Sequence, residues 1–147
     1  MKRPKYKIVS LEDLERVSKN VFKNYEEVQL AYLYGSYAKN LQNVYSDIDM
    51  GVVLKDNFEE APLYFAELSS KIEKFFNYKI NVDLRILNQC TPRFLFNVIN
   101  EGKVLYVRNT TFMHEFELKV IYQYQDIKPM LDLYDNKSIM EALDDEY

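Results

Sequence analysis

The sequence predicts an α+β fold, built as one domain over residues 1–147. Segments with helical spacing of apolar residues alternate with short apolar runs that have strand character. Hydrophobic residues make up 48% of the chain, which is enough to form a buried core. The alternation is irregular, and the chain contains neither a GxGxxG motif nor a Walker lysine motif. It therefore does not predict a doubly wound nucleotide-binding domain.

Capping residues mark several helix boundaries. Ser10 followed three residues later by Asp13 is typical of a helix start, and so is Thr91 before Pro92. Gly102 is expected to end the helix that Pro92 begins. The expected helices are residues 11–25, a short helix from Ser36, a helix beginning near Pro62, and residues 92–102. A last, long helix is expected from the apolar residues at 112, 116, 120 and 124, and Pro129 should kink or restart it.

The strands are short and rich in apolar residues. The expected strands are Val28–Tyr34, Asp47–Leu54, Lys79–Leu87 and Val104–Val107. Gly51 lies inside the second of them, where a glycine suggests either a bulge or a close approach to the backbone.

A glycine turn and a pair of carboxylates accompany the first two strands. Gly35 lets a ligand approach the backbone, and the free N–H groups of the turn with the Ser36 hydroxyl can hold phosphate oxygens. Ten residues separate Ser36 from Asp47. Asp47 and Asp49 are two residues apart on an expected strand, so their side chains share a face about 7 Å apart. Such a pair can hold one or two Mg²⁺ ions together with substrate phosphates.

This motif resembles the signature of the DNA polymerase β-like nucleotidyltransferase superfamily. It consists of Gly-Ser, ten residues, and Asp-x-Asp preceded by Ser46. The shortness of the chain points to the minimal nucleotidyltransferase (MNT) branch. One departure is Asn40, where members of the superfamily usually carry glycine. Asparagine tolerates a left-handed conformation better than most residues, so the turn is expected to be kept.

The resemblance implies both a fold and a function. The fold is a small mixed β-sheet flanked by α-helices, with the carboxylates on one exposed face. Many MNT proteins are antitoxins paired with a HEPN-domain RNase toxin, and some transfer AMP from ATP to a tyrosine of that toxin, as in type VII systems. The chain would then be a Mg²⁺-dependent protein adenylyltransferase that binds its toxin. Two alternatives stay open: an antitoxin that only occludes its toxin, and a nucleotidyltransferase acting on a small molecule such as an aminoglycoside.

A third carboxylate is expected from the third strand. Asp83 and Arg85 alternate with Val82 and Leu84, so the polar pair lies on the face opposite the apolar one. A two-metal phosphoryl-transfer site needs such a carboxylate as a metal ligand or base, so we assign Asp83 to the catalytic and metal-binding set. Arg85 either holds a phosphate oxygen or neutralises Asp83 in an ion pair, and the sequence leaves both roles open.

Three neighbouring carboxylates need a compensating positive charge. At an effective dielectric constant of about 20, each pair separated by about 7 Å repels by about 2 kcal/mol. A divalent cation would compensate for this, and so would salt bridges from Lys39, Lys55 or Arg85. Tyr37 and Tyr45 flank the turn and the carboxylates, and either stack on a nucleobase or pack within the fold.

Composition limits the remaining functions. With one histidine and one cysteine, the chain lacks the residues for a His-based zinc site, a Ser-His-Asp triad or an intramolecular disulfide. The net charge of −4 argues against tight direct binding of nucleic acid. No apolar run suggests a membrane span or signal peptide, which predicts a cytoplasmic protein. The basic segment Lys2–Lys7 and the acidic segment Glu141–Tyr147 are expected to be flexible termini, and the acidic one either is solvated or meets a basic partner.

Overall fold

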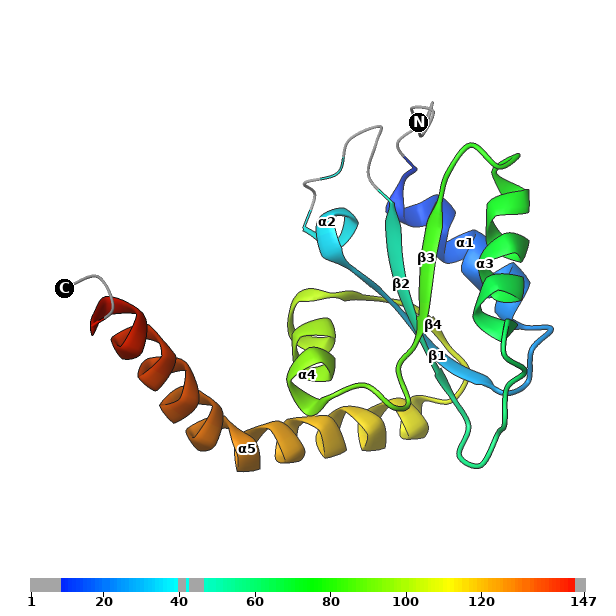
Figure 1. Ribbon diagram of the computed structural model, residues 1–147. Coiled ribbons are helices and arrows are strands. Elements are labelled where there is room, and N and C mark those ends of the chain that lie inside the picture. The colour runs from blue at the N-terminus through cyan, green and yellow to red at the C-terminus, as the bar shows by residue number, and fades with distance from the viewer. Residues whose placement is uncertain (1–8, 40–41, 43–46, 145–147) are drawn as a thin grey trace.

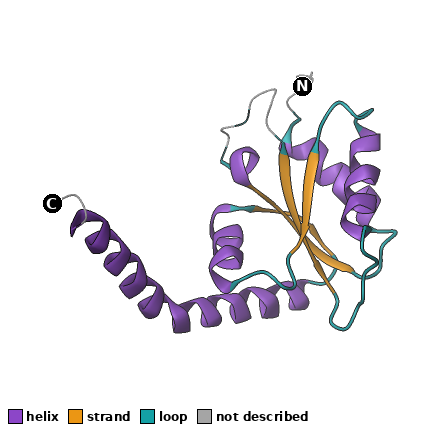
Figure 2. Cartoon of the chain, viewed as in Figure 1, coloured by secondary structure: helices purple, strands orange, loops and turns teal. Residues whose placement is uncertain are grey.

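The computed structural model describes residues 9–39, 42 and 47–144, which form one β-sheet with helices on both faces (Figures 1 and 2). The features expected of Lys2–Lys7, Asn40, Tyr45 and Ser46 lie outside the described residues. In chain order the elements are α1 (Leu11–Phe22), β1 (Val28–Tyr34), α2 (Gly35–Ala38), β2 (Ile48–Leu54), α3 (Tyr64–Phe75), β3 (Val82–Ile86), α4 (Pro92–Glu101), β4 (Lys103–Val107) and α5 (Thr110–Asp144).

The sheet is mixed, with the strand order β3-β2-β1-β4. Strand β1 is antiparallel to both β2 and β4, whereas β2 and β3 are parallel. A parallel pair requires a crossover connection, and α3 lies within the one that joins β2 to β3. The prediction of an α+β fold with a small mixed sheet flanked by helices is therefore confirmed.

The predicted helix caps are present. The Ser10 hydroxyl accepts a hydrogen bond from the backbone N–H of Asp13 at 3.1 Å, and the Thr91 hydroxyl accepts one from the N–H of Phe94 at 3.3 Å. These bonds satisfy N–H groups that have no partner inside the helix, and each cap stabilises its helix by about 1 kcal/mol. Pro92 is the first residue of α4, as expected.

Several element boundaries differ from the sequence prediction by one to three residues, including the end of α1 and the starts of β2, α3, β3 and β4. Strand β3 begins at Val82 rather than Lys79, because Asn77 and Tyr78 adopt φ angles of 53° and 58° at the end of α3. These left-handed residues form a turn that delays the extended backbone. Helix α3 begins at Tyr64, two residues after Pro62.

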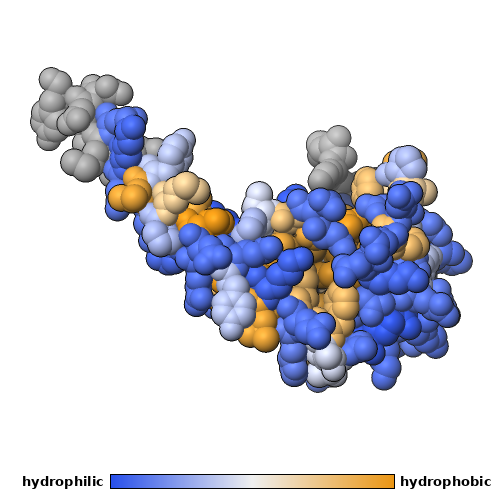
Figure 3. Space-filling model, turned by 90° about the horizontal axis from the view of Figure 1, so that it is seen from below, coloured by the Kyte–Doolittle hydropathy of each residue, from blue (hydrophilic) through white to orange (hydrophobic). Residues whose placement is uncertain are grey.

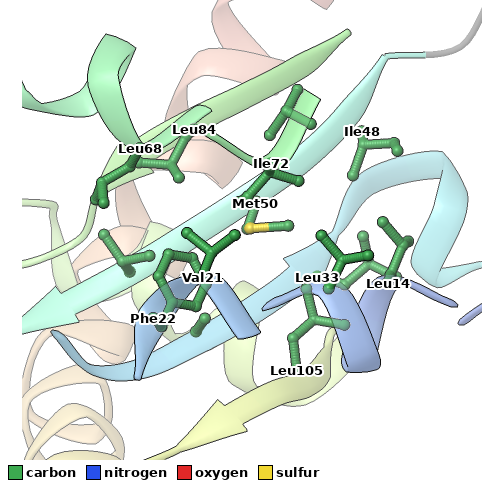
Figure 4. Packing of buried hydrophobic residues seen from close by; sticks show 14 of the residues in the cluster. Leu14, Val21, Phe22, Leu33, Ile48, Met50, Leu68, Ile72, Leu84 and Leu105 are labelled. Carbon is green, nitrogen blue, oxygen red and sulfur yellow. The ribbon is translucent and has the colours of Figure 1, made fainter. Parts of the chain in front are cut away.

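The larger hydrophobic core lies between the sheet and helices α1 and α3. Figure 4 shows side chains of both helices directed towards those of the strands. Full burial of each large aliphatic or aromatic side chain stabilises the fold by about 1.5–3 kcal/mol. The residues labelled there are Leu14, Val21, Phe22, Leu33, Ile48, Met50, Leu68, Ile72, Leu84 and Leu105, all of which are buried.

A second core covers the other face of the sheet, beneath α4 and the first turns of α5. Its buried residues include Leu30 and Tyr32 of β1 and Val120 of α5. The Tyr32 hydroxyl donates a hydrogen bond to Glu117 at 2.8 Å, which satisfies a polar group inside this core. Burial and this hydrogen bond to Glu117 raise the pKa of Tyr32 well above its usual value.

Gly51 is required by packing rather than by a bulge. The pairing of β2 with β3 is regular past this residue, from Ile48 to Val52. A Cβ atom at Gly51 would lie only 2.7 Å from Cδ1 of Leu87, a side chain that is fully buried in the second core. The sequence offered two alternatives, a bulge or a close approach to the backbone, and the close approach is therefore correct. The group that approaches the backbone is the Leu87 side chain.

Helix α5 bends and then extends away from the sheet (Figure 1). Pro129 lies inside it, where a proline removes one backbone hydrogen bond and its ring displaces the preceding turn. The predicted kink at Pro129 accounts for this bend. Residues Glu141–Asp144 belong to α5, so the described part of the acidic terminal segment is helical. None of the helices in the described part of the chain has the length and apolarity that crossing a membrane requires.

Arg108 joins the start of α5 to the rest of the domain. Its guanidinium donates hydrogen bonds to the carbonyl oxygens of Val28 at 2.9 Å, Phe22 at 2.8 Å and Tyr25 at 3.1 Å. The backbone N–H of Arg108 donates to the carbonyl of Gln29 at 2.9 Å. One half-buried side chain thus holds together the end of α1, the start of β1 and the residues that precede α5.

Candidate active site

The expected phosphate turn lies where β1 ends. Gly35 is the first residue of α2 and has a φ angle of 72°, in the region that favours glycine. Ser36 follows it in α2 and is partly buried. Tyr34, the last residue of β1, is paired with Asp49 of β2. The antiparallel pairing therefore places the Gly35–Ser36 turn beside the Asp49 carboxylate, at the end of the sheet where Figure 1 shows α2.

Gly35 lies directly against Asp49. A Cβ atom on Gly35 would overlap the Oδ2 atom of Asp49 and would lie 3.1 Å from its Cγ atom. Two independent constraints, the positive φ angle and this contact, therefore require glycine here. The close contact joins the two halves of the motif, which are separated in the sequence.

The second and third carboxylates meet through the parallel strands. Asp49 and Asp83 are direct partners in the pairing of β2 with β3, and neighbouring strands lie about 4.8 Å apart. Because Ile48 and Met50 are buried in the core under α1 and α3, Asp49 faces the opposite side, towards α4. Asp47 immediately precedes β2. The structure thus brings Asp47, Asp49 and Asp83 to one end of the sheet.

The ionisation of Asp49 is affected by the other two carboxylates. Burial raises the pKa of the Asp49 carboxyl above its usual value, and the negative charges of Asp83 and Asp47 raise it further. The positive charge of Arg85 opposes this increase only in part. Ionised Asp49 is therefore destabilised in the folded protein, and a bound cation would relieve the destabilisation.

The donor set fits a magnesium ion that is shared with a substrate. Among the described residues, no group of three or more His, Cys, Asp or Glu side chains is arranged so that it could hold a metal ion by itself. Mg²⁺ in nucleotide sites is usually held by one or two carboxylates together with substrate phosphates and water, so it does not require a preformed cage. Asp49 and its neighbours supply oxygen ligands and the excess negative charge that such an ion needs.

Arg85 is positioned by an aromatic residue that the sequence analysis missed. Its guanidinium carbon lies 5.0 Å from the ring centroid of Phe94 in α4. The same ring contacts Tyr34 edge-on at a centroid distance of 5.6 Å. Among the described residues Arg85 forms no salt bridge, so the ion pair with Asp83, one of the two roles left open by the sequence, is not made. A cation–π contact fixes the guanidinium while leaving its N–H groups available.

Tyr34 is the second residue that the sequence analysis missed. Burial raises its pKa to about 12, although the Arg85 charge lowers it and the charges of Asp49 and Asp83 raise it. These interactions place the Tyr34 side chain within the same electrostatic environment as the carboxylates. Its position immediately before Gly35 was the available signal, because the last residue of a strand shares the site of the turn that follows. Phe94, by contrast, gave no such signal.

The other expectations near the motif have clear outcomes. Lys39 forms a salt bridge with Glu101 at 2.9 Å, so it does not neutralise the carboxylates. Tyr37 is buried in the larger core, which favours packing over stacking on a nucleobase. Cys90 is half-buried and its thiol donates a weak hydrogen bond to the Ile86 carbonyl, at 3.5 Å.

Replacing Gly35 with alanine is expected to weaken binding of a non-hydrolysable ATP analogue with Mg²⁺ by at least about tenfold and to destabilise the fold by roughly 1–3 kcal/mol. The new Cβ atom must displace the Asp49 carboxylate. Asn57→Ala is the matched control, because Asn57 also has a positive φ angle, 65°, but does not lie in the motif. Calorimetric titration and urea unfolding measure both effects. Wild-type nucleotide affinity in the Gly35 variant would contradict the assignment.

Comparisons with known proteins agree with this geometry. Residues 17–111 match the model of the family described as "Polymerase beta, Nucleotidyltransferase". The protein adenylyltransferase MntA of Shewanella oneidensis is 31% identical over 106 residues, which cover 71% of this chain and 72% of that relative. The family model therefore covers β1 to β4 and the whole candidate site.

Solved structures share the fold. A chain from a toxin–antitoxin crystal structure with AMP-PNP superposes with a TM-score of 0.70 at 24% identity and covers 89% of this chain and 99% of that one. A chain from the complex of the tri-AMPylated Shewanella oneidensis HEPN toxin with its MNT antitoxin gives a TM-score of 0.67 at 23% identity, covering 88% and 99%. From the family-model match over residues 17–111 and the 31% identity to MntA, we conclude that the chain belongs to the polymerase β nucleotidyltransferase family.

Proposed function

We propose that this protein is a Mg²⁺-dependent adenylyltransferase that transfers AMP from ATP to a tyrosine of a HEPN-domain toxin and thereby acts as its antitoxin. The contact of the Gly35 turn with the Asp49 carboxylate carries the proposal, because it puts a phosphate-binding turn next to metal-binding oxygens. The choice of a protein acceptor is supported by the 31% identity to a protein adenylyltransferase. It is also supported by the shared fold with chains from toxin–antitoxin complexes.

Each site residue has a role in this reaction. Asp47, Asp49 and Asp83 would hold one or two Mg²⁺ ions. When bound, such an ion neutralises phosphate charge and polarises the phosphate oxygens. Backbone N–H groups at Gly35 and the Ser36 hydroxyl would hold the β- and γ-phosphates, which leaves the α-phosphorus open to the acceptor.

The chemical step is a transfer between two oxygens. The tyrosine oxygen of the acceptor forms a bond to the α-phosphorus, while the bond from that phosphorus to the bridging oxygen breaks and pyrophosphate leaves. Asp83, which is exposed on the site's face, accepts the phenolic proton. Arg85, held over Phe94, donates hydrogen bonds to a phosphate oxygen.

The architecture favours a protein over a small molecule as acceptor. Asp83 and Arg85 are both exposed, so the site is open to a large partner. An open site of this kind suits a tyrosine on the surface of another protein.

The test is the intact mass of the cognate HEPN toxin after incubation with this protein, ATP and Mg²⁺. The wild type is expected to add one or more adenylate increments, and Asp83→Asn to reduce the rate at least about 10²-fold, since positioning and metal electrostatics dominate phosphoryl transfer. Asp56→Asn is the control, because Asp56 is an exposed carboxylate in the loop after β2. A toxin that is neutralised without any gain in mass would instead identify an occluding antitoxin.

A further inference from the structure

The second half of α5 projects from the domain, and we call residues 126–144 the α5 arm. One side of the helix is tied to α4. Tyr124 stacks on Phe96 with a centroid distance of 4.1 Å and an interplanar angle of 8°, and Asp135 of the arm pairs with Arg93 at 3.2 Å. Figure 1 shows that the arm continues beyond these contacts, away from the sheet.

The arm exposes large apolar side chains that the described part of the chain does not cover. Met130 is 66% exposed, Leu133 71% and Tyr134 69%. Leu118 and Tyr122 continue the exposed apolar surface towards the domain, at 51% and 62%. Figure 3 shows hydrophobic residues along this projecting helix. A contiguous apolar surface on a projecting helix marks a site of protein association, because a helix gains most of its stability from packing.

Charge identifies the kind of partner. Residues 126–144 contain five acidic residues and two lysines. Both lysines face an acidic neighbour within the helix, Lys128 with Asp132 at 2.7 Å and Lys137 with Glu141 at 3.9 Å. With Arg93 of α4, which pairs with Asp135, the five acidic and three basic residues leave a net charge of −2 on and beside the segment that carries the apolar surface. A second copy of the arm would bring like charges together, and nucleic acid would be repelled in the same way, whereas a basic protein surface would be attracted.

We propose that the α5 arm is the docking element for the acceptor protein and that it lies in an apolar groove bordered by lysine and arginine side chains. The identity of that partner as the HEPN toxin rests on the proposed function above. In this arrangement Met130 and Leu133 supply the buried contacts, and the acidic residues supply orientation and fast association. The arm is separate from the carboxylate site, so docking and chemistry can be tested independently.

The test uses Met130→Ala with Leu133→Ala in the full-length protein and the cognate toxin as the titrant. Loss of two central apolar contacts is expected to raise the Kd at least about tenfold, and alanine keeps the helix intact. Leu63→Ala with Phe75→Ala is the matched control, because Leu63 is 70% exposed and Phe75 55% exposed elsewhere on the surface. The control pair should bind like the wild type. Wild-type affinity should also fall with added salt, because the Debye length is only about 8 Å at 0.15 M.

The following results would overturn the proposal. Unchanged affinity in the arm variant, equal losses in the two double variants, or insensitivity to salt would all exclude the arm as the docking element. A wild-type protein that self-associates, and becomes monomeric in the arm variant, would assign the surface to a second copy. The measured Kd for the toxin does not depend on catalysis. Weakened binding without any adenylate on the toxin would leave the arm proposal standing and remove the proposed enzymatic function.

Discussion

Asp49→Asn is expected to reduce adenylate transfer at least about 10²-fold and to make the nucleotide-free protein more stable. The carboxylate is needed to hold a cation, but without that cation its charge is unfavourable. Burial and the charges of Asp83 and Asp47 raise its pKa, so the folded state disfavours ionised Asp49. Asparagine keeps nearly the same shape and removes the charge.

The sign of this effect depends on pH. Because the folded-state pKa of Asp49 is raised above the usual 3.8, its contribution to stability is fully present below that value and is lost as the pH rises through the folded-state pKa. Urea unfolding of the wild type and Asp49→Asn should give similar stabilities at the acid end of this range. At neutral pH the variant should be the more stable of the two. A variant that is less stable at neutral pH would mean that a favourable partner holds the carboxylate, against the cation-site interpretation.

Replacing Arg108 with methionine is expected to lower the free energy of unfolding by about 2–4 kcal/mol, since it leaves several half-buried carbonyl oxygens without a donor. The acceptors are the carbonyl oxygens of Val28, Phe22 and Tyr25, and all three hydrogen bonds are partly buried. Methionine retains much of the packing volume, so the loss reports mainly on the hydrogen bonds.

Arg16→Met is the matched control for Arg108. Arg16 is an exposed residue of α1 that pairs with Asp13 at 3.1 Å within the same helix. Exposed pairs of this type contribute less than about 1 kcal/mol. Urea unfolding should therefore separate the two variants clearly, and similar losses in both would show that Arg108 does not organise the fold.

The parts of the fold that follow local rules were predictable from the sequence. Ser10 and Thr91 cap helices because their hydroxyls reach backbone N–H groups three residues away, and this requires no knowledge of the remaining chain. Strand β1 has the predicted bounds, Val28–Tyr34, because both faces of the strand are largely buried and its sequence is apolar apart from Gln29. The grouping of Asp49 with Asp83 follows from strand alternation once the two strands are taken to be neighbours.

The unpredicted features arise from contacts between distant segments. Phe94 positions Arg85 only because α4 covers the face of the sheet from which Arg85 projects, and the spacing of apolar residues in α4 does not say which of them meets a guanidinium. Likewise, the lack of a side chain at Gly51 makes room for the Leu87 side chain, which comes from the segment after β3. Lys39 pairs with Glu101 rather than with an aspartate of the motif. Helical periodicity also predicted α5 but not that Leu133 would be exposed, since periodicity does not show where the domain ends.

The junction at Arg108 has a kinetic consequence. Because its hydrogen bonds hold the segment that leads into α5 against β1, and β1 pairs directly with β2, the start of the helix is anchored to the sheet that carries Asp49. If the acceptor protein docks on the α5 arm as proposed, its tyrosine would be kept near the α-phosphate and would react at a high effective concentration. A short tyrosine peptide would lack this tether. Its transfer should be slow at any practical concentration, and the selectivity of the reaction would come from where the acceptor is held rather than from the sequence around the modified tyrosine.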